Sequence, residues 1–322
     1  MSVDFSAVGL AVGHATDERG ATGLTVVRPI DGGMRGGAHV LGRATGTREL
    51  QALSPTALAG RVDAVLLTGG SAYGLDAAAG IMRWMEERNR GFSVGGGVVP
   101  IVPAAVIFDL APLGDFSARP TPDMAYRACD AAVSRDIAEG SVGAGTGATI
   151  GKAAGRERAM KGGLGCATRR QGEMVVSALA VVNAFGDVRG SDGRIIAGAR
   201  GENGAFLDST RLIAEMAASP RFGAAPAHNT TLCVVATNQS LERGELTQLA
   251  RAAAAALFRR ISPVGTPVDG DVIFALCNPD SPPGALMPLE VLASAALEEA
   301  IERGVRLAVG REGIPGLADR TQ

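Results

Sequence analysis

The sequence has few of the residues on which metal sites and disulfide frameworks depend. Only three histidines and four cysteines occur among its 322 residues, and aromatic residues make up 4%. The cysteines are far apart and form no CxxC pair: they are Cys129, Cys166, Cys233 and Cys277. The cysteines and histidines therefore do not have the spacing of zinc ligands. Four thiols in so long a chain are predicted to be buried. The sequence predicts no metal and no cofactor.

Net charge is also low, because 31 Lys and Arg nearly balance 33 Asp and Glu, giving −2. Nothing here predicts a basic surface for nucleic acid or a membrane. The N-terminal stretch MSVDFSAVGL has an early acid and no basic region, so no signal peptide is expected. A long uncharged run, residues 91–108, holds four glycines and two prolines and is not a membrane helix. We predict a soluble, cytoplasmic protein.

Hydrophobic residues make up 46% of the chain, enough for a large core. Short apolar runs predict buried strands at Leu24–Val27, Val62–Leu67, Val98–Ile107, Val175–Val182, Leu232–Ala236 and Val272–Leu276. Helical periodicity predicts helices over 73–90, 124–133, 246–257 and 289–301, the last ended by Gly304. Strands and helices alternate without an internal repeat or a long linker. One α/β or α+β domain spanning residues 1–322 is expected.

A glycine-rich stretch from Gly143 to Ala148 matches the loose G-x-G-x-x-A dinucleotide pattern. No apolar strand precedes it, and Glu157 and Glu173 miss the position where the pattern needs an acid. Lys152 does not complete a phosphate-binding loop, because Ala153 replaces the required Ser or Thr. Tight backbone packing explains these glycines better. A non-catalytic nucleotide-binding protein remains a remote alternative.

A second glycine-rich stretch, Gly69–Gly74, lies at a predicted strand-to-helix turn, where a nucleophilic serine such as Ser71 is sometimes held. Tyr73 occupies the position where that motif requires glycine. His228 is the only histidine downstream, so chain order leaves a Ser–Asp–His triad open as a minor alternative.

Several polar residues stand at the ends of predicted core strands, and each has an ordinary structural explanation by itself. Asp269 and Asp271 flank Gly270 before one strand, and Asn183 closes another. An exposed loop, Ser219–Asn229, runs directly into Thr230 and the strand that follows. In a shared site, the acids could orient a catalytic amine and the amide of Asn183 could stabilise an oxyanion.

Taken together, these segments resemble the DmpA-type L-aminopeptidase/D-esterases, whose relatives include the nylon-oligomer hydrolases. The matching stretches are GGSAYGLDAAAG (69–80), GVVPIVPAAVIFDL (97–110), VGAGTGATIGK (142–152), MKGGLGCAT (160–168), LAVVNAFGDV (179–188), NTTLCVVATN (229–238) and DGDVIFAL (269–276). They follow in unchanged order from about residue 20 to residue 280, so the resemblance covers most of the chain.

The resemblance implies an N-terminal-nucleophile-like hydrolase on a layered α/β/β/α sandwich of the DmpA and ornithine-acetyltransferase type. It places a self-cleavage between Asn229 and Thr230, giving fragments 1–229 and 230–322. A threonine hydroxyl needs an adjacent base, and the α-amine freed at Thr230, with a pKa near 8, is suited to that role. The Thr–amine pair then replaces the Ser–His pair of a triad.

The resemblance also implies roles for five other residues. Asn183 and Tyr73 match groups that stabilise the oxyanion, while Asp269, Asp271 and Lys152 match a charged cluster around the nucleophile. Family members form ring-like tetramers, so a homotetramer acting on a small amide or peptide is expected.

The two residues before Tyr73 depart from the family pattern. Its aminopeptidases carry an acid close before this tyrosine, whereas Ser71 and Ala72 stand here. An aminopeptidase or amidase is favoured, with one of the two aspartates meeting the substrate amine. A nylon-oligomer-type amidase or ornithine-acetyltransferase-like acyl transfer are the alternatives.

Overall fold

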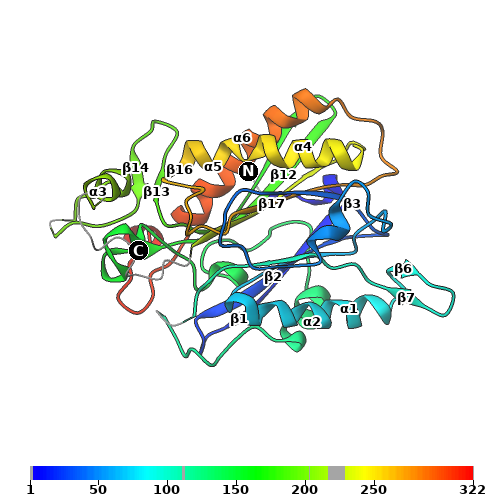
Figure 1. The fold of residues 1–322 in the computed structure, drawn as a ribbon, viewed down its shortest axis with the longest axis horizontal. Coiled ribbons are helices and arrows are strands. Elements are labelled where there is room, and N and C mark those ends of the chain that lie inside the picture. Colours follow the sequence, from blue (N-terminus) through cyan, green and yellow to red (C-terminus); the bar gives the residue numbers. More distant parts are fainter. Residues whose placement is uncertain (1–2, 111–112, 203, 217–228, 322) are drawn as a thin grey trace.

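Two five-stranded sheets lie face to face, with helices on both outer sides (Figure 1). This architecture comes from a computed structural model that describes residues 3–110, 113–202, 204–216 and 229–321. The first sheet has the strand order β1-β2-β5-β8-β4. Its strands are β1 (Leu10–Asp17), β2 (Thr22–Pro29), β5 (Val65–Thr68), β8 (Ala104–Val106) and β4 (Thr47–Arg48).

The second sheet has the order β11-β12-β15-β17-β3 and carries the candidate residues. Its strands are β11 (Gly163–Gln171), β12 (Met174–Asn183), β15 (Thr230–Thr237), β17 (Val272–Cys277) and β3 (Arg35–Val40). β15 pairs antiparallel with β12 and parallel with β17. All eight residues of β15 are buried, as expected of a central strand covered on both faces.

Residues alternate between two cores along the strands of the second sheet. On β15, Leu232 and Val234 pack toward the first sheet, whereas Cys233 and Val235 pack against the helices α4, α5 and α6. A third core lies between the outer face of the first sheet and helices α1 and α2. The layer order is therefore helix, sheet, sheet, helix, which confirms the predicted α/β/β/α sandwich.

The helices are α1 (Ala78–Glu86), α2 (Pro122–Asp130), α3 (Ser209–Met216), α4 (Arg243–Ala253), α5 (Ala255–Arg260) and α6 (Leu286–Arg306). Their starts follow local chemistry. The hydroxyl of Thr121 accepts from the N–H of Met124, and Pro122 stands at the first helical position of α2. Glu242 and Glu245 form a reciprocal capping box at the start of α4. No helix among the described residues is long and apolar enough to cross a membrane.

Gly304 does not end the last helix, contrary to the prediction, because α6 continues to Arg306. The glycine serves helix–sheet contact instead. A methyl group at Gly165 on β11 would lie 2.3 Å from the backbone nitrogen of Gly304, so the helix and strand backbones touch here. Tertiary packing therefore explains this glycine better than helix termination.

Two other predicted segments are divided in the structure. The stretch 98–107 forms β7 (Val98–Val99) and β8, and 73–90 begins as a 3-10 turn, η3 (Ser71–Ala77), before α1. The four cysteines are buried free thiols, as predicted. The remaining elements are η1 (Ser6–Val8), η2 (Leu50–Leu53), β6 (Phe92–Ser93), η4 (Gly143–Gly145), β9 (Thr149–Ile150), η5 (Lys152–Ala154), η6 (Arg156–Arg158), β10 (Met160–Lys161), β13 (Asp187–Arg189), β14 (Ile195–Ala197), β16 (Ile261–Ser262) and η7 (Ala318–Thr321).

Candidate functional site

Thr230 is the first residue of β15, and Asn183 is the last residue of β12. The antiparallel register places the two directly opposite each other. Thr230 shares the face of Leu232 and Val234, which pack between the two sheets. Thr230 is 4% exposed and Asn183 is fully buried. Two polar side chains therefore meet at the end of an otherwise apolar inter-sheet core.

The peptide bond between Asn229 and Thr230 has a hydroxyl and an N–H group beside its carbonyl. The Asn229 oxygen accepts from Thr230 Oγ1 at 2.5 Å and from the Gly270 N–H at 2.8 Å. A methyl group at position 270 would lie 2.7 Å from Thr230 Oγ1, so glycine permits this approach. The carbonyl is thus polarised by one donor while a potential nucleophile lies next to it.

Asn183 connects three segments through its side chain. Its Oδ1 accepts from the Thr149 N–H at 3.0 Å and from Lys152 Nζ at 2.9 Å, and its Nδ2 donates to the Phe108 oxygen at 3.2 Å. Phe108 follows β8 of the first sheet, so this amide links the ends of both sheets. The second N–H of Nδ2 has no acceptor among the residues that the structure describes, so it is available to a ligand.

Lys152 is held beside Asn183 by two hydrogen bonds from Nζ, to Oδ1 and to the Asn183 carbonyl at 3.2 Å. Burial of the ammonium lowers the pKa of Lys152 to about 7, and the negative charge of Asp269 partly opposes that shift. Among the described residues no ion pair joins Lys152 to Asp269 or Asp271. The contact that we expected between this lysine and the two acids is not formed, and Lys152 interacts with Asp269 only through charge at a distance.

Asp269 and Asp271 are 2% and 1% exposed, so they do not form the open polar turn that their sequence alone allows. Asp271 Oδ1 accepts from the Thr231 N–H at 2.6 Å, and Asp269 Oδ2 accepts from the Thr266 N–H at 2.8 Å. Burial raises the pKa of both carboxyls. For Asp271 the charge of Asp269 adds to the effect and brings the pKa to about 7.

Tyr73 lies on η3 and is 56% exposed, unlike the buried residues of this cluster. The Arg119 guanidinium stacks on its ring, 3.5 Å from the centroid, and within the described ranges no hydrogen bond joins Tyr73 to the other candidate residues. Its turn is nevertheless tied to the cluster. The Ser71 N–H donates to the Ile107 oxygen at 3.0 Å, and the next residue, Phe108, accepts from Asn183.

Two buried charged residues near this turn, Asp109 and Lys161, were not predicted from the sequence as site residues. Asp109 accepts from Thr22 Oγ1 at 2.6 Å and from the Gly70 N–H at 2.7 Å. Lys161 Nζ donates to the carbonyls of Thr146 and Ala148, both at 2.7 Å. Burial raises the pKa of Asp109 to about 6 and lowers that of Lys161 to about 7, while each charge opposes the other's shift. The sequence feature that could have identified Asp109 and Lys161 is that each is the one charged residue within an otherwise uncharged stretch.

The glycine-rich stretch at Gly143 packs against β1 and β2 and offers no phosphate cradle. Residues 143–150 are all buried. A methyl group at Gly143 would lie 2.5 Å from Thr25 Oγ1, and one at Gly147 would lie 2.5 Å from the Ala21 oxygen. The glycines therefore serve close backbone packing, as the sequence favoured. His228, the histidine of the alternative triad, and most of the loop 219–229 lie outside the described residues.

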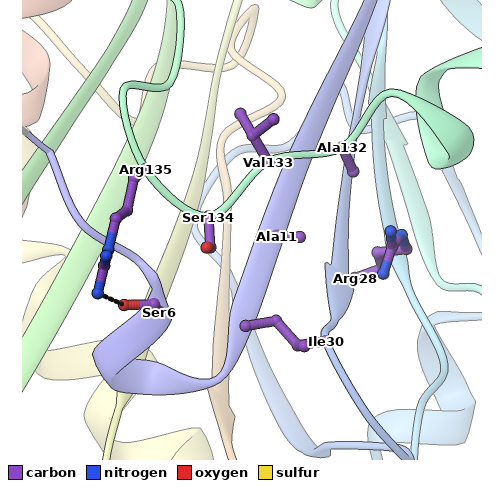
Figure 2. Close-up of a pocket in the computed structure, with 8 residues that line it drawn as sticks. All are labelled: Ser6, Ala11, Arg28, Ile30, Ala132, Val133, Ser134 and Arg135. Carbon is purple, nitrogen blue, oxygen red and sulfur yellow. Dashed lines mark hydrogen bonds between the residues drawn. The ribbon is translucent and has the colours of Figure 1, made fainter.

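An open hollow of about 590 Å³ lies elsewhere, on the first sheet (Figure 2). Arg28 and Ile30 on one side and Val133 and Arg135 on the other line it. None of the six candidate catalytic residues borders this hollow. The candidate site is therefore defined by the buried strand ends and not by this hollow.

Known proteins support one family assignment. The model of peptidase family S58 matches residues 6–315. An uncharacterized aminopeptidase of Mycobacterium tuberculosis strain H37Rv is 42% identical over 318 residues, covering 93% of this chain and 90% of the relative. A 6-aminohexanoate-oligomer endohydrolase of Kocuria sp. strain KY2 is 33% identical, covering 84% and 74%.

Solved structures share the fold at low sequence identity. A beta-aminopeptidase of Burkholderia sp. has a TM-score of 0.70 at 21% identity, covering 98% of this chain and 92% of that one. An L-aminopeptidase D-Ala-esterase/amidase of Ochrobactrum anthropi, described as a variant of the Ntn hydrolase fold, has a TM-score of 0.69 at 19% identity, covering 98% and 90%. The chain therefore belongs to peptidase family S58 and is a hydrolase.

Proposed function

We propose that this protein is a self-processing hydrolase of small amides and peptides, with Thr230 as its nucleophile. The observation that carries this proposal is the placement of the Asn229 carbonyl between Thr230 Oγ1 and the Gly270 N–H. A hydroxyl next to a polarised carbonyl is what an intramolecular acyl shift requires.

In the self-cleavage step, Thr230 Oγ1 attacks the Asn229 carbonyl carbon and the Gly270 N–H stabilises the oxyanion. The C–N bond breaks, the Thr230 nitrogen gains a proton, and Asn229 becomes esterified to the threonine oxygen. Water then hydrolyses that ester, which leaves a carboxylate on Asn229 and a free α-amine on Thr230. The products are residues 1–229 and 230–322.

In turnover, the new α-amine takes the proton of the Thr230 hydroxyl as it attacks a substrate carbonyl. The amine product leaves with that proton, and water releases the acyl group from the threonine ester. The remaining N–H of Asn183 and the Tyr73 hydroxyl are proposed to stabilise the oxyanion, because both positions match the family motif.

Lys152, Asp269 and Asp271 are proposed to set the charge around the Thr230 amine. Two carboxylates and one ammonium leave the cluster with a net negative charge when all are ionised. Such a cluster stabilises a substrate ammonium at a site where an unpaired charge would cost several kcal/mol. This favours acyl groups that carry a free amine, which agrees with the names of the relatives called aminopeptidases. A cytoplasmic homotetramer is part of the same proposal, and its tetrameric state rests on the family resemblance.

Mass spectrometry of the purified protein tests the proposal. The wild type should give two associated fragments of about 23 and 9 kDa, from 32.6 kDa divided in the proportion 229 to 93 residues. Thr230→Ala should remain one inactive chain. Thr237→Ala, which removes a buried hydroxyl at the other end of β15, should still mature. A wild type that hydrolyses amides while remaining uncut would contradict the mechanism.

A further inference from the structure

Arg119 lies beside two exposed aromatic rings, and no carboxylate pairs with it in the described part of the chain. Its guanidinium is 3.5 Å from the centroid of Tyr73 and 5.4 Å from that of Phe116. The rings are 56% and 48% exposed. Its Nε donates to the Phe116 oxygen at 3.4 Å, whereas its two terminal nitrogens have no hydrogen-bond partner and no carboxylate within 4 Å among the described residues.

The chain has a second stack of a guanidinium on a tyrosine, and in that stack the arginine is paired with a carboxylate. Arg83 stacks on Tyr126 at 4.7 Å, and there Asp123 supplies the anion, 2.9 Å from a terminal nitrogen. At Arg119 the ring stacks in the same way, but that acceptor is missing. A guanidinium held flat on a ring keeps its donor edge oriented for a planar anion such as a carboxylate.

The loop that carries Arg119 is packed against the turn that carries Tyr73. A methyl group at Gly70 would lie 2.9 Å from Pro120 Cδ, so the residue after Arg119 touches the start of η3. That turn bonds to residues 107 and 109, and Phe108 between them bonds to Asn183. Arg119 therefore stands at the outer edge of the proposed site, on the same side as Tyr73.

We propose that Arg119 binds a carboxylate of the substrate, on the side of the leaving amine. This rests on the proposed function and narrows its substrates to short peptides with a free C-terminal carboxylate. Asp269 and Asp271 are buried beside Thr230 and repel an anion from the acyl side. The site then recognises an ammonium at its buried end and a carboxylate at its exposed edge, which suits dipeptides.

Alanyl-alanine and its C-terminal amide test the proposal, since they differ only in that carboxylate. Wild-type enzyme should show at least about a tenfold higher kcat/KM for the free acid, mostly through KM, as expected of a charged hydrogen-bonded pair. Arg119→Gln should bring the ratio of the two kcat/KM values to about one, and Arg119→Lys should retain part of it. Arg83→Gln, the matched control, should keep the wild-type ratio.

Each outcome decides the matter. Equal cleavage of both peptides by the wild type would overturn the role of Arg119 and leave the hydrolase itself intact. A preference that survives in Arg119→Gln would do the same. A mature wild type that cleaves neither peptide nor any simple amide would overturn the proposed function and this inference together. If Arg119→Gln fails to mature, Arg119→Lys decides instead: a ratio below that of the wild type supports the role of Arg119, and an unchanged ratio overturns it.

Discussion

Thr230 and Asn183 are cross-strand partners, each at the end of a strand that is buried along nearly its whole length. This pairing fixes the distance between the proposed nucleophile and the proposed oxyanion donor by backbone hydrogen bonds and not by loop geometry. Groups on rigid elements keep their geometry better than groups on loops. The sheet therefore pre-orients the site.

Gly270→Ala should slow self-cleavage. The new methyl group would lie 2.7 Å from both Thr230 Oγ1 and the Ala44 oxygen, so the Thr230 hydroxyl or the backbone around position 270 must shift. A displacement of about 1 Å at a reacting group costs up to about a hundredfold in rate. The fraction of cut chain against time, read from denaturing gels, measures it. Gly244→Ala, an open position on α4, is the control and should mature at the wild-type rate.

The rate of self-cleavage should rise with pH through about 7. Burial brings the pKa values of Lys152 and Asp271 to about 7, so the cluster loses protons there and gains a base for the Thr230 hydroxyl. Uncut precursor transferred to buffers from pH 5 to 9 gives the profile. Lys152→Arg, which stays charged, should be slow with a flatter profile. A wild-type rate that is independent of pH would count against this base.

Asp271→Asn should change how stability depends on pH. The folded-state pKa of Asp271 lies above its unfolded value, so the folded state binds the extra proton. The contribution of Asp271 to the free energy of unfolding is fully present below about pH 4 and is lost as the pH rises through about 7. In an uncleaved Thr230→Ala background, the wild-type Asp271 should therefore lose stability relative to Asn between pH 4 and 8. Urea midpoints measure the difference, and a constant difference would contradict the assignment.

Lys161→Met should destabilise the fold. It removes the donor of two buried carbonyls and leaves Asp109 without its opposing charge. A buried polar group that loses its hydrogen-bond partner costs about 1–3 kcal/mol. Chemical unfolding of Lys161→Met, Asp109→Asn and the double variant should give a double loss smaller than the sum of the single losses. Arg194→Met, at an 88% exposed side chain, should be neutral.

The sequence by itself determined the core strands, the layer order through the family resemblance, and the residues that meet at the strand ends. Alternating apolar residues specify a strand because a side chain's face depends only on its position along that strand. The family resemblance carried by the motifs from Gly69 to Asp271 then indicated Thr230, Asn183, Lys152 and the two acids as candidates.

Only the tertiary structure decided which of these groups touch and what the remaining glycines and charges do. The N–H of Gly270 on the Asn229 carbonyl, Gly304 against Gly165, and Arg119 over Tyr73 each join residues distant in the chain. Local pattern carries no information about such contacts, because they depend on how the sheets and loops pack. Packing also buried Lys152 and the aspartates, and that desolvation shifts their pKa values toward neutrality.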